Sequence, residues 1–181
     1  MKIGARSRVR AAVAATIAVA ALGPASSEAH GQEATDEAVV VYLARHAERA
    51  DDSRDPPLSP EGVARVEALL HVLTDAGLTQ VHTTDLRRTR QTADPLAKAH
   101  DAPLAVYDPF ALAAFAELLK ATPGRHFVSG HSNTTPALVR ALGGDPHGEI
   151  AEDEYDRLYV VVIVPGAEPV TTLLRFGLSG P

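Results

Sequence analysis

The sequence has no cysteine, no tryptophan and a single methionine, and aromatic residues make up 4% of its 181 residues. The absence of cysteine excludes disulfide bonds, thiolate metal sites, a cysteine nucleophile and a lipoprotein anchor, and it leaves the redox compartment open. Basic residues are scarce as well, since 17 of them face 23 acidic residues and the net charge is -6. A chain with this charge is not expected to bind nucleic acid or an anionic membrane surface.

One extended apolar run lies close to the N-terminus. Lys2 and three arginines precede the apolar stretch 11–22, and Ser27-Glu28-Ala29 offers small residues at the spacing of a cleavage site. The stretch is shorter than the roughly 20 residues that span a bilayer, so the pattern predicts a signal peptide over residues 1–29, cleaved near Ala29. We therefore expect an exported protein, periplasmic or secreted, with no stable membrane association after cleavage. An uncleaved anchoring helix is the alternative.

The remaining chain has the pattern of one α/β domain. Residues 30–37 are small and polar and are interpreted as a linker, and residues 38–181 are interpreted as a single domain. Apolar runs typical of strands alternate with stretches of helical periodicity, which predicts a three-layer α/β/α fold with a mostly parallel central sheet. The expected strands are 38–44, 79–83, 103–107, 125–129 and a final hairpin of 158–164 and 170–176. The expected helices begin at Pro60, 86 (interrupted near Pro95), 108 and about 133.

Cationic and imidazole side chains stand at the exits of three of these strands. Arg45-His46 follows the first strand, arginines at 87–90 follow the second, and His131 follows the strand at 125–129. Strand exits of an open α/β sheet line up along one edge, where ligands bind. A phosphoryl group is the simplest ligand for such a set, because guanidinium groups donate paired bonds to phosphate and a neutral imidazole can attack phosphorus.

Four segments resemble signatures of the histidine phosphatase superfamily, the phosphoglycerate-mutase-like phosphatases, and they occur in the family's order. They are Arg45-His46-Ala47-Glu48 (with Ala in place of the usual Gly), Leu58-Ser59-Pro60-Glu61-Gly62, Thr84 to Ala93, and Gly130-His131-Ser132-Asn133. The resemblance covers roughly residues 39–142. It implies a phosphoglycerate-mutase-like fold and a phosphatase that works through a phosphohistidine intermediate, with neither a metal nor an organic cofactor.

The same resemblance implies roles for four residues. His46 would be the nucleophile, and Arg45 and Arg88 would clamp the phosphoryl oxygens. His131, protonated beside the dianion, would be a third donor. Arg90 stays open as an alternative to Arg88, because a cluster of arginines at a helix start does not by itself show which member points inward.

Further polar residues are candidates for substrate contacts and for the general acid. Ser132 and Asn133 stand near a helix start, where they could add donors to a bound anion. Glu48 either contacts the substrate or braces an arginine. Many family members carry a glutamate shortly after the strand at 103–107, but alanines stand there in this chain, so Asp108 and Glu154 are the candidate acids.

We therefore expect a small exported phosphatase acting on phosphomonoesters or phosphoramidates, and the scarcity of aromatics favours a small phosphorylated metabolite or a phosphorylated side chain as substrate. The missing glutamate favours substrates with good leaving groups. A non-catalytic phosphate-binding protein on the same fold is the alternative. A metalloenzyme using some of the eight histidines is a third reading, although the histidines lack metal-ligand spacing. The oligomeric state stays open.

Overall fold

Strands and helices alternate along residues 38–177, the part of the chain that the computed structural model describes. In chain order they are β1 (Val39–Arg45), α2 (Pro60–Val72), β2 (Gln80–Thr83), α3 (Arg87–Ala99), β3 (Leu104–Val106), α4 (Leu112–Lys120), β4 (Gly124–Gly130), α5 (Thr134–Ala141), β5 (Arg157–Ile163) and β6 (Val170–Arg175). The expected signal peptide (1–29) and linker (30–37) lie outside the described residues. Within 38–177, no helix has the length and apolar character needed to cross a bilayer.

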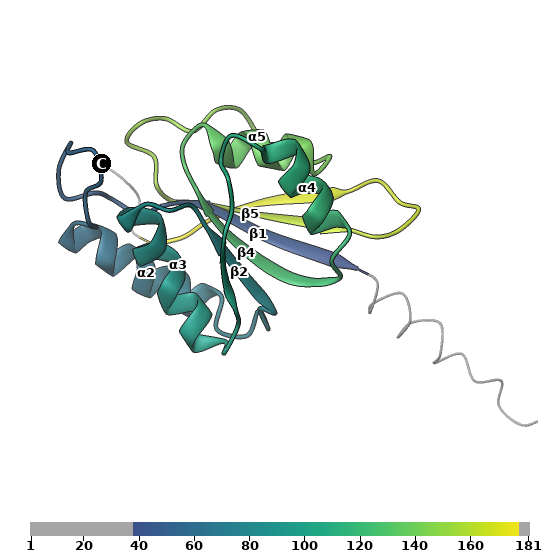
Figure 1. Cartoon of the computed structure of the whole chain (residues 1–181), viewed down its shortest axis with the longest axis horizontal. Coiled ribbons are helices and arrows are strands. Elements are labelled where there is room, and N and C mark those ends of the chain that lie inside the picture. The colour runs from purple at the N-terminus through teal and green to yellow at the C-terminus, as the bar shows by residue number, and fades with distance from the viewer. Residues whose placement is uncertain (1–37, 178–181) are drawn as a thin grey trace, which may run out of the picture.

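The strands form one six-stranded sheet in the order β3-β2-β4-β1-β5-β6. The first four strands of the chain are mutually parallel, whereas β5 runs antiparallel to β1 and β6 antiparallel to β5. The expected mostly parallel sheet and late hairpin are both confirmed. Because β1, β2 and β4 are parallel neighbours, their carboxyl ends lie at the same edge of the sheet (Figure 1).

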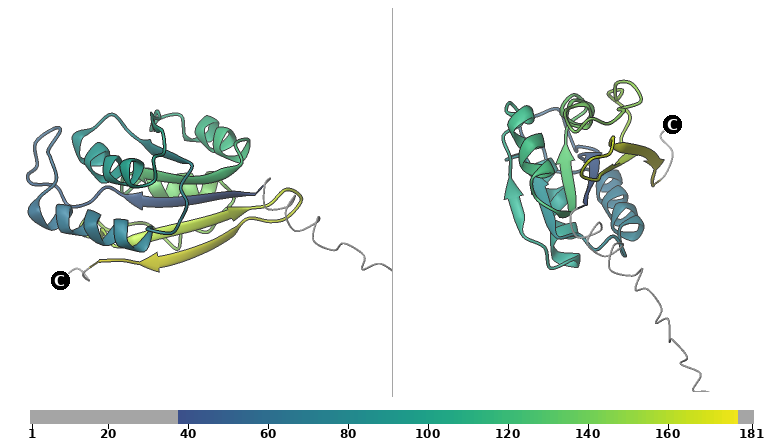
Figure 2. Two further views of the ribbon diagram at one scale, coloured as in Figure 1. Left: turned by 90° about the horizontal axis from the view of Figure 1, so that it is seen from below. Right: turned by 90° about the vertical axis from the view of Figure 1, so that its right-hand side faces the viewer.

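Helices cover both faces of the sheet, as Figures 1 and 2 show: α2 and α3 lie on one face, α4 and α5 on the other. Val41 and Leu43 of β1 pack with Leu138 of α5, while Ala44 packs with Leu69 of α2 on the opposite face. Side chains alternate across a strand, so covering both faces requires apolar residues at almost every position of β1. The expected three-layer α/β/α architecture is confirmed.

Two helices differ from the expectation. α3 continues through Pro95 without a break, because Ala93 and Leu96 are fully buried on either side of it and hold the helix against the sheet. α4 begins at Leu112 and not at Asp108. The carboxylate of Asp108 instead accepts a hydrogen bond of 2.9 Å from the Phe110 backbone N–H and closes a turn before the helix.

Candidate active site

Arg45, His46 and His131 come together at the carboxyl edge of the sheet. Arg45 is the last residue of β1 and lies in register with Gly130, the last residue of β4. His46 follows, and its backbone N–H donates to the Gly130 carbonyl over 2.8 Å. The rings of His46 and His131 lie edge to face with their centroids 5.5 Å apart. The sheet therefore brings the two imidazoles into one site, although they are far apart in the sequence.

His46 has the geometry of a nucleophile. Its side chain is only 4% exposed, and Nδ1 lies 2.7 Å from the carbonyl oxygen of Ala47. A carbonyl can only accept, so Nδ1 carries the proton and Nε2 keeps its lone pair. Burial lowers the pKa of His46 to about 3, and the charges of Arg45 and Arg88 act in the same direction. The imidazole is therefore neutral at pH 7 and able to attack.

The imidazole of His131 is also neutral at pH 7. Its Nε2 lies 3.2 Å from the hydroxyl of Thr84, and its backbone N–H donates to Thr134 Oγ1 over 2.9 Å. Burial, followed by the charges of Arg88 and Arg45, lowers the pKa of His131 to about 4. A bound phosphate dianion would offset the arginine charges and favour protonation. The role of His131 as a protonated donor therefore stays a prediction.

The guanidinium of Arg45 uses only part of its hydrogen-bonding capacity within the described part of the chain. Its Nη1 donates to the backbone carbonyls of Ala151, Glu152 and Glu154 at 2.7–3.0 Å. Its Nη2 donates to the phenol oxygen of Tyr155 at 3.3 Å, while its buried Nε has no hydrogen-bond partner in the described part of the chain. The loop before β5 thus fixes the guanidinium and leaves Nε for a ligand.

Of the three neighbouring arginines on α3, Arg88 is the one that reaches the site. It lowers the pKa of both His46 and His131, and its Nε is buried with no partner among residues 38–177. Arg90 instead pairs with Asp85 at 2.8 Å on the surface, which excludes it as the alternative clamp. The helical phase does not separate the two, because Arg88 stands one turn before the buried Thr92 and Arg90 one turn before the buried Ala93.

Glu48 braces an arginine, which was one of its two expected roles, and its ion pair argues against the other, a substrate contact. Its carboxylate pairs with the guanidinium of Arg65 on α2 at 2.6 Å. Its backbone carbonyl accepts from the Ser59 N–H at 2.9 Å, and a Cβ on Gly62 would come within 2.3 Å of that same oxygen. The Leu-Ser-x-x-Gly segment therefore docks the start of α2 closely against the chain that follows His46.

The two candidate acids are poorly suited to give a proton. Asp108 is exposed and occupied by its turn. Glu154 accepts hydrogen bonds from Arg157 and Arg175 at 2.6 and 2.5 Å; these outweigh the opposing effect of burial and lower the pKa of Glu154 to about 2. A carboxyl with this pKa is ionised at neutral pH, so Glu154 cannot act as the acid.

Ser132 and Asn133 occupy the turn between His131 and α5. Ser132 is half-buried, and Asn133 is exposed at the N-cap position, where its side chain makes no capping bond. Both stand beside the positive end of the α5 dipole, as expected for groups that meet an anion. Their contact with substrate stays a prediction.

Sequence reasoning missed two residues that the fold brings to the site. Thr84 follows β2 and bonds His131. Tyr155 lies in the loop before β5, and its ring centroid is 4.0 Å from the guanidinium carbon of Arg45 and 6.1 Å from the ring of His46. In the sequence, the loop before β5 drew attention only as a source of a carboxylate, Glu154. Its position follows from β5 pairing with β1, which no local pattern reveals.

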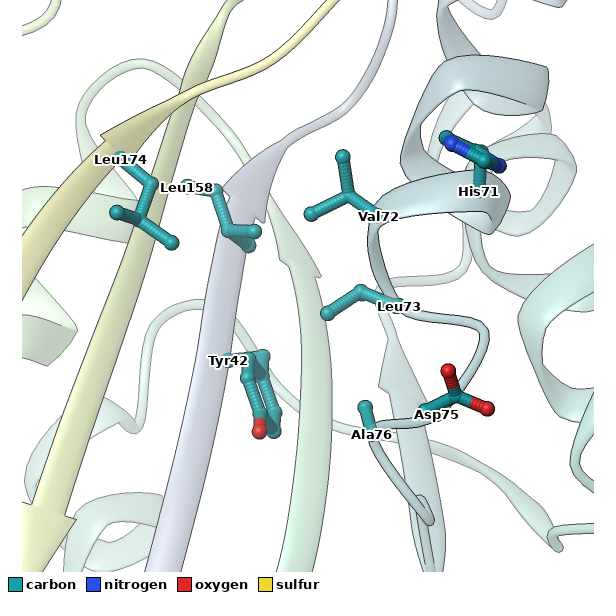
Figure 3. Close-up of a pocket in the computed structure, with 8 residues that line it drawn as sticks. All are labelled: Tyr42, His71, Val72, Leu73, Asp75, Ala76, Leu158 and Leu174. Carbon is teal, nitrogen blue, oxygen red and sulfur yellow. The ribbon is translucent and has the colours of Figure 1, made fainter.

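No group of three or more histidine, aspartate and glutamate side chains within 38–177 is arranged to hold a metal ion. A separate surface pocket lies between the end of α2 and the sheet, lined by Tyr42, Leu158 and Leu174 among others (Figure 3). None of the predicted site residues lines this pocket.

Comparison with known protein families gives one match. The family model of the histidine phosphatase superfamily (branch 1) matches residues 41–111, which include the first three of the four signature segments. Over these residues the chain is similar to the histidine phosphatase superfamily. No curated protein sequence matches it.

Solved structures of low sequence identity share the fold. The protein histidine phosphatase SixA complexed with tungstate is 17% identical, with a TM-score of 0.58 over 75% of this chain and 96% of that one. A mycobacterial glucosyl-3-phosphoglycerate phosphatase is 15% identical, with a TM-score of 0.60 over 78% and 100%. A phosphoglycerate mutase from Bacillus anthracis is 15% identical, with a TM-score of 0.55 over 79% and 94%. The expected phosphoglycerate-mutase-like fold is thereby confirmed.

Proposed function

We propose that this protein is an exported phosphatase that hydrolyses phosphomonoesters or phosphoramidates through a phosphohistidine intermediate on His46. The observation that carries the proposal is a buried, neutral imidazole beside two guanidinium groups, those of Arg45 and Arg88, whose buried Nε atoms have no partner in the described part of the chain. Buried donors without a partner suit an oxyanion ligand.

In this reaction each group has one task. Arg45 and Arg88 bind the phosphoryl oxygens and stabilise the negative charge that spreads over them in the transition state. Nε2 of His46 attacks phosphorus, while the bond from Nδ1 to the Ala47 carbonyl holds the ring in the required tautomer. Water then opens the phosphoramidate and releases phosphate.

The proposed substrate is either a small phosphorylated metabolite or a phosphorylated side chain, as expected from the sequence. Two of the similar structures are a protein histidine phosphatase and a glucosyl-3-phosphoglycerate phosphatase, and these names cover a phosphorylated protein side chain and a small phosphorylated metabolite. Both substrate classes present the same dianionic group to the site.

Export rests on the N-terminal pattern of basic residues, an apolar stretch and Ser27-Glu28-Ala29. Mass spectrometry of the protein recovered from periplasm or medium should give a first residue near His30. Recovery only from membranes, with the apolar stretch retained, would support the anchoring alternative.

Turnover of 4-nitrophenyl phosphate tests the catalytic part, because its good leaving group needs little help from an acid. The wild type should release nitrophenol with formation of an acid-labile phosphoprotein, and His46→Ala should abolish both. His71→Ala, which changes an exposed histidine of α2, is the matched control. Activity of His46→Ala above about a tenth of wild type would mean that the nucleophile is another residue. A wild type that binds phosphate but yields neither product would favour the non-catalytic alternative.

A further inference from the structure

Phosphate ester hydrolysis by this site requires a proton for the departing oxygen, and the carboxyl groups are badly placed to supply it. Glu48 and Glu154 are tied to arginines. Glu152 is 72% exposed, and one oxygen of its carboxylate lies 3.1 Å from Arg49 and 3.6 Å from Arg45. This carboxylate is therefore engaged by two arginines at the surface. Within the described residues, a donor of another kind is needed.

Tyr155 is a proton-bearing side chain that contacts both Arg45 and His46. Its ring lies over the guanidinium of Arg45 and is tilted by 55° to the ring of His46, with the two ring centroids 6.1 Å apart. The phenol oxygen of Tyr155 lies 3.3 Å from Arg45 Nη2, so the side chain stands beside one of the two arginines and beside the expected nucleophile. The phenol therefore lies at the site where the phosphoryl group is expected.

The hydrogen bonding of the phenol leaves a proton to give. The bond from Arg45 Nη2 uses the Tyr155 oxygen as acceptor at 3.3 Å, and a phenol that accepts still has its own O–H to donate. The neighbouring guanidinium groups would stabilise the phenolate that remains after transfer.

We propose that Tyr155 is the catalytic proton donor to the leaving oxygen. This inference rests on the proposed function. As the bond from His46 Nε2 to phosphorus forms and the ester P–O bond breaks, the phenol proton moves to the ester oxygen, which leaves as an alcohol. In the second half, water attacks phosphorus and the P–N bond breaks. One proton of that water returns to the phenolate, and phosphate leaves.

Two phosphate esters of similar size separate proton donation from a positioning role. 4-Nitrophenyl phosphate releases an acidic phenol that needs no proton, whereas benzyl phosphate releases a strongly basic alkoxide that does. For Tyr155→Phe, which keeps the ring over Arg45, kcat/KM for benzyl phosphate should fall about 10²-fold or more. For the same variant, kcat/KM for 4-nitrophenyl phosphate should stay within about threefold of wild type.

Tyr42→Phe is the matched control, since Tyr42 belongs to β1 but lines the separate pocket of Figure 3, and it should change neither rate. Equal losses of Tyr155→Phe on both esters, or no loss on either, would overturn the inference, as would a wild type unable to hydrolyse benzyl phosphate at all. Absence of wild-type turnover on 4-nitrophenyl phosphate would instead refute the proposed function. Thermal melting of each variant confirms that the fold is retained.

Discussion

Mild acid should destabilise this protein, because its buried histidines bind protons much less readily in the folded chain than in the unfolded chain. Burial lowers the pKa of His46 to about 3 and, together with the nearby arginines, that of His131 to about 4. Burial also lowers the pKa of His82 to about 4; this residue lies behind the site on β2. An unfolded histidine has a pKa of about 6.5. Between about pH 6.5 and pH 4 the unfolded chain therefore binds protons that the folded chain does not.

The sign and size of the effect follow from this difference. The stabilisation is fully present above the unfolded pKa of about 6.5 and is lost as the pH falls toward the folded values. Each histidine contributes about 1.4 kcal/mol per pH unit, so the three together give a slope of about 4 kcal/mol per pH unit. An unfolded histidine is half protonated at pH 6.5, so the loss between pH 6.5 and pH 5 amounts to about 5 kcal/mol, which is comparable to the whole stability of a marginally stable domain.

Substitution of His82 tests one part of this sum. Its Nε2 lies 3.2 Å from Nδ1 of His126, whose Nε2 is 2.9 Å from the Thr122 carbonyl. Because that carbonyl only accepts, His126 donates to it and receives a hydrogen bond from His82. His82→Gln keeps an amide donor near the position of Nε2 but cannot titrate. The variant should reduce the slope by about 1.4 kcal/mol per pH unit.

Urea unfolding followed by circular dichroism at several pH values between about 7 and 5 measures the slope. His71→Gln, a change of an exposed histidine, is the control and should leave the slope unaltered. A free energy of unfolding that changes by less than about 1 kcal/mol over this range would refute the reasoning, because the histidines would then titrate alike in the folded and unfolded states.

Two further predictions concern the arrangement of the site. Arg88→Ala should lower kcat/KM for 4-nitrophenyl phosphate by about 10²–10³-fold, while Arg90→Ala, which breaks only the surface pair with Asp85, should stay within about threefold; the reverse ranking would place the clamp at Arg90. Gly62→Ala should destabilise the protein by about 1–3 kcal/mol in thermal or urea unfolding, because its methyl group would overlap the Glu48 carbonyl. Unchanged stability would mean that the contact relaxes without strain.

Features that depend on near neighbours in the chain were predicted well. Ser59 caps α2 as expected, its hydroxyl accepting from the Gly62 N–H at 3.1 Å. The apolar run of β1 and the turn between β5 and β6 are likewise local signals, carried by side-chain type and periodicity. The exceptions were α3 and α4. Packing against the sheet keeps α3 helical through Pro95. The carboxylate of Asp108 closes a turn, so α4 begins after that turn and not at Asp108.

Some features of the candidate site were likewise predictable from the sequence, and others were not. Residue type and spacing along the chain were enough to predict the α/β alternation, the four signature segments and the two histidines at strand exits. Three other features became visible only in the folded chain: Arg88 points inward while Arg90 pairs outward, Arg157 and Arg175 hold Glu154 ionised, and Tyr155 stands over Arg45. Side-chain type and periodicity act within a few residues, whereas strand pairing assembles the site. Adding β5 antiparallel to β1 brings a loop more than a hundred residues away against the start of the site.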